Sequence, residues 1–259
     1  MRRNRLFEFE DLRWFPASIR KGGTDYLRYF LDKTGFYDVA APLLIDQLEK
    51  SGQSQIFDLC SGGGGAIQSL HRELVRLGGS GITITLSDKY PNTEAFNHIK
   101  KESGNAISYL KEPVDATSIP TSQQGILTMF TAMHHFEPAI LKKILQNAAA
   151  QNKSVSFFDG GDKNFLAVAG ILFFQPVSFL LLTPFFRPFS LKRLLFTYLL
   201  PAIPLMTMWD GIVSVTRLYH PDQLLAIARE AVPDYNWSSG TLKNKIGMKV
   251  TYLQGRPQR

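Results

Sequence analysis

Cysteine is almost absent from this sequence of 259 residues, in which Cys60 stands alone. No disulfide can form within the chain, and a single thiol suits a reducing, cytoplasmic compartment. The basic start of the chain is not followed by an apolar run, so no signal peptide is expected. No internal repeat is visible either, and at this length one domain with an insertion is the natural count.

Motifs for nucleic acid and for metal are missing as well. The formal charge of +7 favours anionic partners, either nucleic acid or anionic lipid. The sequence shows no helix-turn-helix, zinc-finger or RNA-binding pattern, so nucleic acid is not expected as a partner. No group of His, Asp and Glu stands at ligand spacing, so no metal is expected.

Acidic residues are missing from a long apolar region. No Asp or Glu occurs over residues 163–209, and residues 165–186 carry no charge at all. This first stretch reaches the roughly 20 residues that cross a bilayer core. Three alternatives stay open: an interfacial or re-entrant hairpin, two crossings, and a hydrophobic lid over a substrate pocket. Prolines in the second stretch weigh against two crossings. Arg187, Lys192 and Arg193 lie at the bend, where they favour contact with anionic headgroups.

What is present centres on the run Ile56–Gly65, which predicts a short buried strand, a glycine turn and the start of a helix. Glycines permit backbone angles closed to other residues and let a ligand approach the main chain. The following helix presents free N–H groups at its N-terminus. This arrangement is typical of the nucleotide-cofactor corner in a doubly wound α/β sheet. A flexible turn without a ligand is the alternative, but the flanking patterns weigh against it.

Further strand patterns follow the glycine turn, and a helix pattern comes before the last two of them. The strands are expected at 82–86, 107–110, 125–130, 154–158, 235–238 and 248–253, and the helix at 221–230. Two helices, at 24–31 and 37–50, are expected in an aromatic-rich N-terminal region. We therefore expect an α/β, doubly wound, Rossmann-like fold with a helical cap.

The segment Asp58-Leu59-Cys60-Ser61-Gly62-Gly63-Gly64 resembles the first motif of class I S-adenosylmethionine (SAM)-dependent methyltransferases, usually Asp-Leu-Gly-Cys-Gly-x-Gly. Cys60 stands at the first glycine of the pattern and Ser61 at its cysteine. The resemblance covers about residues 55–159 and implies a sheet of seven strands with the last one antiparallel. It also implies four parts: a cap at 1–51, a SAM-binding core at 52–163, an apolar insertion at 164–210 and closing elements at 211–259.

The resemblance implies SAM as the cofactor and assigns roles to the strand ends. Asp88 would hold the ribose, Asp115-Ala116 the adenine amine, and Asp58 the ammonium end, partly through the turn backbone. The segment 131–136 would face the methyl group. The cofactor-binding set implied in this way is Asp58, Cys60, Ser61, Gly62, Gly64, Asp88, Lys89, Asp115, Ala116 and Thr131.

Each of these residues also has a structural alternative. Asp88 could cap the next helix, and Asp115 could cap a turn. Cys60 could be a small packing residue. A hydroxyl acceptor needs a base, which His134 or His135 could supply, although at least one of the two is expected to be structural.

The expected function is methyl transfer from SAM to a small, lipophilic acceptor by direct in-line displacement. An aromatic cap and an apolar insertion suit such an acceptor. The protein is expected to be cytoplasmic, with attachment to the inner face of an anionic membrane. Two alternatives stay open. One is an NAD(P)-dependent oxidoreductase, which would want Gly-x-Gly-x-x-Gly after the first strand. The other is a non-catalytic membrane-surface protein that retains the fold.

Overall fold

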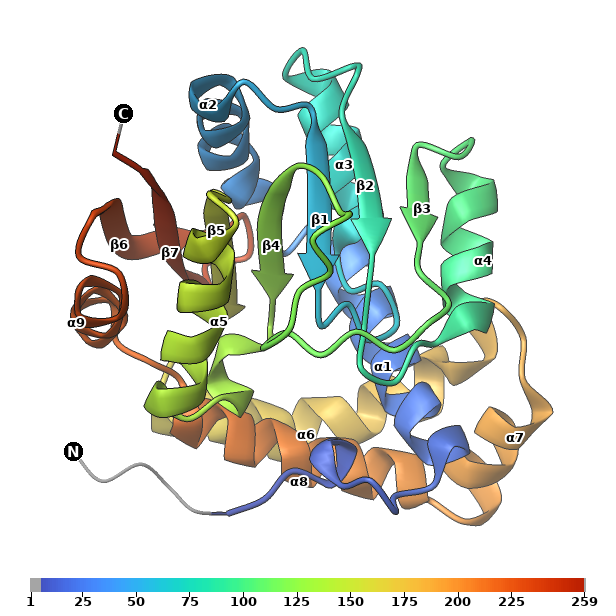
Figure 1. Ribbon diagram of the computed structural model, residues 1–259. Coiled ribbons are helices and arrows are strands. Elements are labelled where there is room, and N and C mark those ends of the chain that lie inside the picture. The colour runs from blue at the N-terminus through green and yellow to red at the C-terminus, as the bar shows by residue number, and fades with distance from the viewer. Residues whose placement is uncertain (1–5, 259) are drawn as a thin grey trace.

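A single sheet of seven strands forms the centre of the computed structural model, which describes residues 6–258 (Figure 1). The strand order is β3-β2-β1-β4-β5-β7-β6, and β7 runs antiparallel to both of its neighbours. The strands are β1 (Gln55–Leu59), β2 (Thr83–Leu86), β3 (Ile107–Tyr109), β4 (Ile126–Phe130), β5 (Val155–Gly160), β6 (Tyr235–Lys243) and β7 (Lys249–Pro257). The predicted α/β fold, its seven strands and the antiparallel last strand are confirmed. The basic residues at positions 1–5 lie outside the described residues.

Both faces of the sheet are covered by helices, because neighbouring residues of a strand point to opposite faces. In β1, Ile56 packs into the core under α2, α3 and α4. Phe57 and Leu59 pack into the core under α5 and α9. These helices are α2 (Ala41–Ser51), α3 (Ile67–Arg76), α4 (Thr93–Glu102), α5 (Pro138–Ala150) and α9 (Pro221–Ala231). Two cores on one sheet give the doubly wound architecture that the strand pattern predicts.

The register brings three strand ends together. Asp58 in β1 stands opposite Leu86 in β2 and opposite Thr128 in β4. The loops that follow these three strands therefore leave the sheet at one place on its carboxyl edge. Ligands of open α/β sheets bind at such a place, where the strand order reverses.

A third layer of helices lies across this carboxyl edge, formed by α1, α6, α7 and α8 (Figure 1). Their bounds are α1 (Ala17–Thr34), α6 (Phe165–Leu182), α7 (Leu191–Leu194) and α8 (Ala202–Arg217). Helix α1 is longer than the predicted helix at 24–31. The predicted helix begins after Gly22 and Gly23, which lower helix propensity, whereas in the structure both glycines lie inside α1. A Cβ on Gly22 would come 2.3 Å from a side-chain atom of Ile203, so glycine lets α1 and α8 pack closely.

A buried arginine holds the apolar insertion against α1. Arg193 is 3% exposed and donates to the carboxylate of Asp25 and to the carbonyls of Phe186 and Pro188. The expectation that Arg193 meets lipid headgroups is therefore wrong, because its charge is used inside the protein. Arg187 and Lys192 are exposed.

The outer surface of the insertion is apolar. The stretch Phe165–Phe185 is long and apolar enough to span a bilayer, and only 6% of its most apolar part is buried. Two further helices, Leu191–Leu199 and Ala202–Arg217, pass the same test together but are bent by 78° at their junction. The insertion is thus a layer over the site that also turns an apolar side outward.

Candidate cofactor and acceptor site

The loop after β1 has the backbone conformation that glycine favours. The φ angles of Gly62 and Gly64 are 55° and 101°, and Cys60 itself adopts 55°. A side chain at Cys60 is therefore held in the left-handed region, at the position where the motif usually has glycine. A Cβ on Gly63 would come 2.7 Å from the carbonyl oxygen of Thr24, so this glycine allows α1 to pack onto the loop.

Asp58 supports the loop from beneath. Its carboxylate accepts from the hydroxyls of Ser61 and Thr128, each at 2.6 Å, and the side chain is 1% exposed. Burial raises the pKa of Asp58 to about 6, against the opposing effect of these two hydrogen bonds. At neutral pH the ionised carboxylate therefore fixes the loop through the hydroxyl of Ser61, and its role at the ammonium end of a cofactor stays a prediction.

Asp88 connects the loops after β1 and β2. Its Oδ2 accepts the N–H of Gly62 and its Oδ1 accepts the N–H of Tyr90, each at 2.7 Å. Two oxygens offer about four acceptor sites, so lone pairs remain for a ribose diol. Burial raises the pKa of Asp88. The alternative helix-capping role is taken by Asn92, whose side chain accepts from the N–H of Ala95.

Lys89 and Asp115 form an ion pair of 3.1 Å across the loops after β2 and β3. Asp115 also accepts from the N–H and the hydroxyl of Thr117, at 2.9 and 2.7 Å, and these bonds together with Lys89 lower its pKa. The predicted turn-capping role is therefore present in the structure. The next residue, Ala116, therefore lies beside a carboxylate whose orientation is held by these contacts.

These loops surround a cavity of about 470 Å³. Most predicted cofactor residues line it, whereas Asp58, Gly64 and His134 do not. The predicted residues that line it are Cys60, Ser61, Gly62, Asp88, Lys89, Asp115, Ala116, Thr131 and His135. Thr131 has a φ of 55° and shares a hydrogen bond of 2.7 Å with the buried hydroxyl of Tyr37. Burial, followed by the negative charges of nearby aspartates, raises the pKa of the Cys60 thiol, which favours packing over nucleophilic chemistry.

One wall of the cavity comes from the N-terminal region, which the motifs did not identify. Glu10, Asp11 and Arg20 line the cavity together with Lys21 and Thr24. The guanidinium of Arg20 donates to the backbone carbonyl oxygens of Glu10 and Leu12. It also lies 4.3 Å from the centre of the Tyr90 ring. The N-terminal region therefore closes one side of this cavity as well as covering the sheet.

The segment that carries Glu8, Glu10 and Asp11 is fixed to α8. Asp210 accepts the N–H groups of Phe9 and Glu10, at 2.7 and 3.1 Å. Burial, together with the charge of Glu10, raises the pKa of Asp210 to about 8. These contacts join residues about 200 positions apart in the sequence and bring three carboxylates to the end of β4.

The two adjacent histidines after β4 have different surroundings. His134 is 2% exposed, and its Nδ1 lies 2.9 Å from Asp159 at the end of β5, which also accepts the backbone N–H of His134. His135 faces the cavity, with its Nδ1 3.1 Å from Asp11 and its Nε2 3.2 Å from Glu10. The expectation that one of the pair is structural fits His134.

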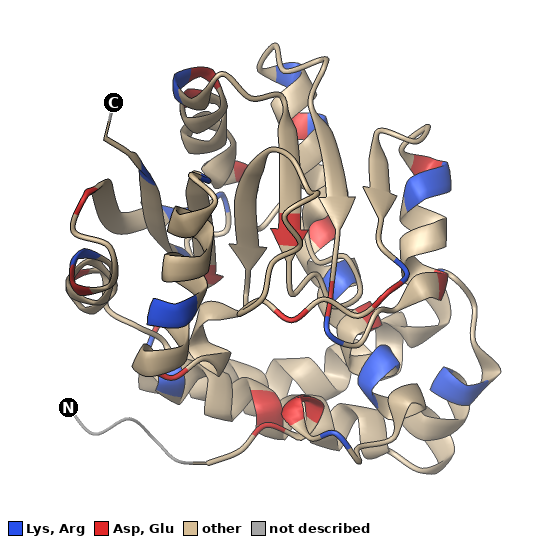
Figure 2. Cartoon of the chain, viewed as in Figure 1, with Lys and Arg blue, Asp and Glu red and all other residues tan. Residues whose placement is uncertain are grey.

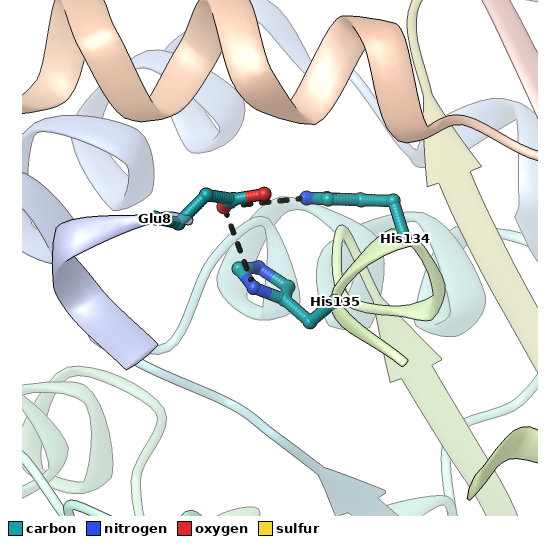
Figure 3. A group of neighbouring side chains, drawn as sticks. All are labelled: Glu8, His134 and His135. Atoms are coloured by element: carbon teal, nitrogen blue, oxygen red, sulfur yellow. Dashed lines mark ion pairs between the residues drawn. The ribbon is translucent and has the colours of Figure 1, made fainter. Parts of the chain in front are cut away.

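The carboxylate of Glu8 points toward both histidines, and Glu8 is completely buried (Figure 3). Its Oε2 is 3.4 Å from Nδ1 of His135 and 4.0 Å from Nε2 of His134. Burial alone would lower the pKa of His135, but Glu8, Asp11 and Glu10 outweigh it and raise that pKa well above 6.5. An imidazole that holds its proton at neutral pH is a hydrogen-bond donor and not a free base. Glu8 is far from the histidines along the chain, so the spacing of residues in the sequence could not show that these three side chains meet.

No protein-family model matches this sequence, and no curated protein matches it. Solved structures match it at the level of the fold. The apo S-adenosylmethionine-dependent methyltransferase SibL has a TM-score of 0.52 and 13% identity, over 89% of this chain and 58% of that one. An O-methyltransferase candidate from Nostoc punctiforme has a TM-score of 0.51 and 11% identity, over 93% of this chain and 61% of that one. This chain therefore has the fold of SAM-dependent methyltransferases and spans less than two thirds of these two chains.

The sheet also separates this fold from the dinucleotide-binding one. Classic dinucleotide-binding sheets have the order 3-2-1-4-5-6, built from parallel βαβ units. Here β7 is inserted between β5 and β6 and runs antiparallel to both. The NAD(P)-dependent oxidoreductase alternative finds no support in this topology.

Proposed function

We propose that this protein is a SAM-dependent methyltransferase that acts on a small, lipophilic acceptor. The observation that carries the proposal is the cavity at the carboxyl edge of β1, β2 and β4, where the glycine loop, Asp88 and Asp115 meet. Asp88 retains acceptor capacity for a ribose diol, and Asp115 with Ala116 suits the adenine amine. SAM would supply a methyl group on a positive sulfonium, which the acidic wall at Glu10 and Asp11 would attract.

The chain's own part in the transfer is to align the acceptor and to exclude water. The layer formed by α1, α6 and α8 covers the carboxyl edge (Figure 1). Apolar side chains of Leu27, Leu31, Phe130 and Phe136 line the same cavity as the polar loops. A pocket with an apolar wall and a few fixed polar groups favours a lipophilic acceptor. His135 lines the cavity and would contact this acceptor. His134 does not line the cavity and would hold His135 in position.

Titration calorimetry of the full chain with SAM and with NADH tests the cofactor. Micromolar SAM binding without NADH binding is the expected result. Asp46→Ala on the exposed surface of α2 is a matched control for Asp88→Ala, because both remove one carboxylate. The proposal fails if wild-type protein does not bind SAM, or if both variants bind it equally well.

We also propose that the insertion attaches the protein to an anionic membrane. Large apolar side chains on its outer surface are more than half exposed, and Arg187 and Lys192 beside them are exposed as well. The most exposed of them are Phe165, Leu166, Phe173, Phe174, Leu181, Leu191 and Leu199. In Figure 2, α6 is drawn without acidic residues along its length. An apolar surface beside cations and without acids matches the interface of an anionic bilayer.

Vesicle sedimentation separates this membrane proposal from its alternatives. Wild-type protein should sediment with vesicles that contain anionic lipid and less with purely zwitterionic vesicles. Replacing Phe173 and Phe174 together with glutamate should abolish sedimentation and leave SAM affinity within a few-fold. A stable dimer in ultracentrifugation that the same substitutions dissociate, with no vesicle binding, would show that a second copy covers this surface. Vesicle binding without SAM binding would instead support a non-catalytic membrane-surface protein.

A further inference from the structure

Two imidazoles and a carboxylate converge beside the cofactor cavity. One ligand atom from each of Glu8, His134 and His135 lies within 4.8 Å of the other two (Figure 3). Neutral imidazole and carboxylate are the donor types that Zn²⁺ accepts. We propose that Glu8, His134 and His135 bind one divalent transition-metal ion, and that Zn²⁺ is the best match to this donor set.

The two distances from Glu8 to the histidines are close to those around a tetrahedral ion. Bonds of about 2.0–2.1 Å place two ligand atoms roughly 3.3–3.4 Å apart. The 3.4 Å between Nδ1 of His135 and Oε2 of Glu8 already meets this value. The 4.0 Å between Nε2 of His134 and the same oxygen is longer than this value by about 0.6–0.7 Å, a closure that metal–ligand bonding favours.

Groups behind the three ligands hold them in a binding orientation. Asp159 lies 2.9 Å from Nδ1 of His134, and Nε2 on the other side of the ring lies 4.0 Å from Glu8. Carboxylates behind a ligating histidine are the usual partners of metal sites. Arg217 is paired with Oε1 of Glu8 at 3.1 Å, and Ser214 donates to Oε2, so the oxygen nearest the histidines is fixed and still has acceptor capacity.

Ligation through Nδ1 of His135 would release the proton of that nitrogen to solvent and would replace its contact with Asp11. The local charge favours this exchange. His135 lies among the carboxylates of Glu8, Glu10 and Asp11, and one imidazole has only two N–H groups to offer them. A divalent ion between the histidines and Glu8 would neutralise more of this negative charge than one proton does. Because His135 lines the cavity, the open coordination position of the ion would face the acceptor.

This position has a chemical consequence that rests on the proposed methyl transfer. An acceptor hydroxyl bound to the ion would lose its proton at a lower pH, because the metal stabilises the oxyanion. The oxyanion would then offer its lone pair to the methyl carbon, and the released proton would pass to solvent. The metal site itself does not depend on this step.

The test is direct metal binding to the full chain after dialysis against a chelator. Calorimetry and elemental analysis should show one Zn²⁺ per chain. Glu8→Gln and His134→Ala should each weaken binding by at least tenfold, since even residues behind a ligand change metal affinity by about 10–100-fold. His98→Ala, a histidine of α4, is the matched control and should bind as wild type does.

Nitrogen-15 NMR of the histidine side chains gives a second measurement that needs no variant. Of the 5 histidines in the chain, Zn²⁺ should shift the ring nitrogens of two. No binding at micromolar Zn²⁺, or equal binding by all variants, would show that Glu8 and the histidines form a hydrogen-bonded cluster only. SAM affinity measured on the same samples keeps the two proposals apart, because bound zinc without SAM binding would refute the methyltransferase alone.

Discussion

Replacing Asp58 with asparagine should change how the stability of this protein depends on pH. The carboxyl group is buried under the glycine loop, and burial raises its pKa from 3.8 to about 6. Asparagine has nearly the same shape and does not titrate. Its amide can accept from one hydroxyl and donate to the other, so Ser61 and Thr128 keep partners. The variant therefore removes the titration with little change in packing.

The magnitude follows from the difference between the two pKa values. This difference is about 2.2 pH units, and each unit corresponds to about 1.36 kcal/mol, which gives roughly 3 kcal/mol. Between about pH 4 and pH 6 the folded protein keeps the proton of Asp58 while the unfolded chain releases it. The contribution of Asp58 to the free energy of unfolding is therefore fully present below pH 3.8 and is lost as pH rises through about 6.

Urea unfolding followed by circular dichroism should be measured on both proteins between about pH 4 and pH 7. The variant should gain about 3 kcal/mol relative to wild type across this range, because wild type alone pays to ionise the buried carboxyl. Asp46→Asn is the control, since Asp46 lies in an exposed pair with Lys50 and should give a nearly constant difference. Parallel stability curves for Asp58→Asn and wild type would refute the reasoning.

Three further substitutions test other parts of the structure. Asp88→Ala should weaken SAM binding by about 1–3 kcal/mol in calorimetry, and unchanged affinity would remove Asp88 from the cofactor site. Cys60→Gly should raise the free energy of unfolding by about 1 kcal/mol in urea, because glycine adopts a φ of 55° without strain, and a loss of stability would contradict this. Arg193→Met should lower stability by roughly 3 kcal/mol in the same assay, since the more distant Arg28 would be the one cation left beside Asp25, and an unchanged midpoint would contradict that.

The sheet and the glycine loop could be predicted because their signals are local. Each strand from β1 to β5 is a short apolar run that ends within two residues of its expected limit. The glycines and Asp88 follow these runs directly, and parallel strands bring their carboxyl ends to one edge. The antiparallel direction of the last strand, by contrast, depends on long-range pairing. It was available only through the resemblance of residues 58–64 to a known motif.

The wall formed by the N-terminal region could not be predicted in the same way. Glu8, Glu10 and Asp11 reach the site because Asp210 binds the backbone between them, about 200 residues away. The spacing of residues in a sequence does not show such a contact. The sequence therefore offered no reason to assign these acidic residues to the site. The same limit applied to Arg193, whose partner Asp25 is 168 residues away. Composition suggested headgroup contact, whereas the fold uses this arginine inside the protein.

For the apolar insertion, composition gives the position of the segment, whereas the fold gives the direction in which each of its sides faces. Composition predicted a segment of residues 163–209 without acids and left open whether it is a lid or a membrane element. The structure makes these two roles compatible, because the inner side of the layer packs on α1 through Ile203 and Phe179 while Phe173 and Phe174 point outward. A lipophilic acceptor held in a membrane would then reach the cavity along the same layer that covers it. Membrane attachment and acceptor choice would in that case have one structural cause, since both depend on this insertion.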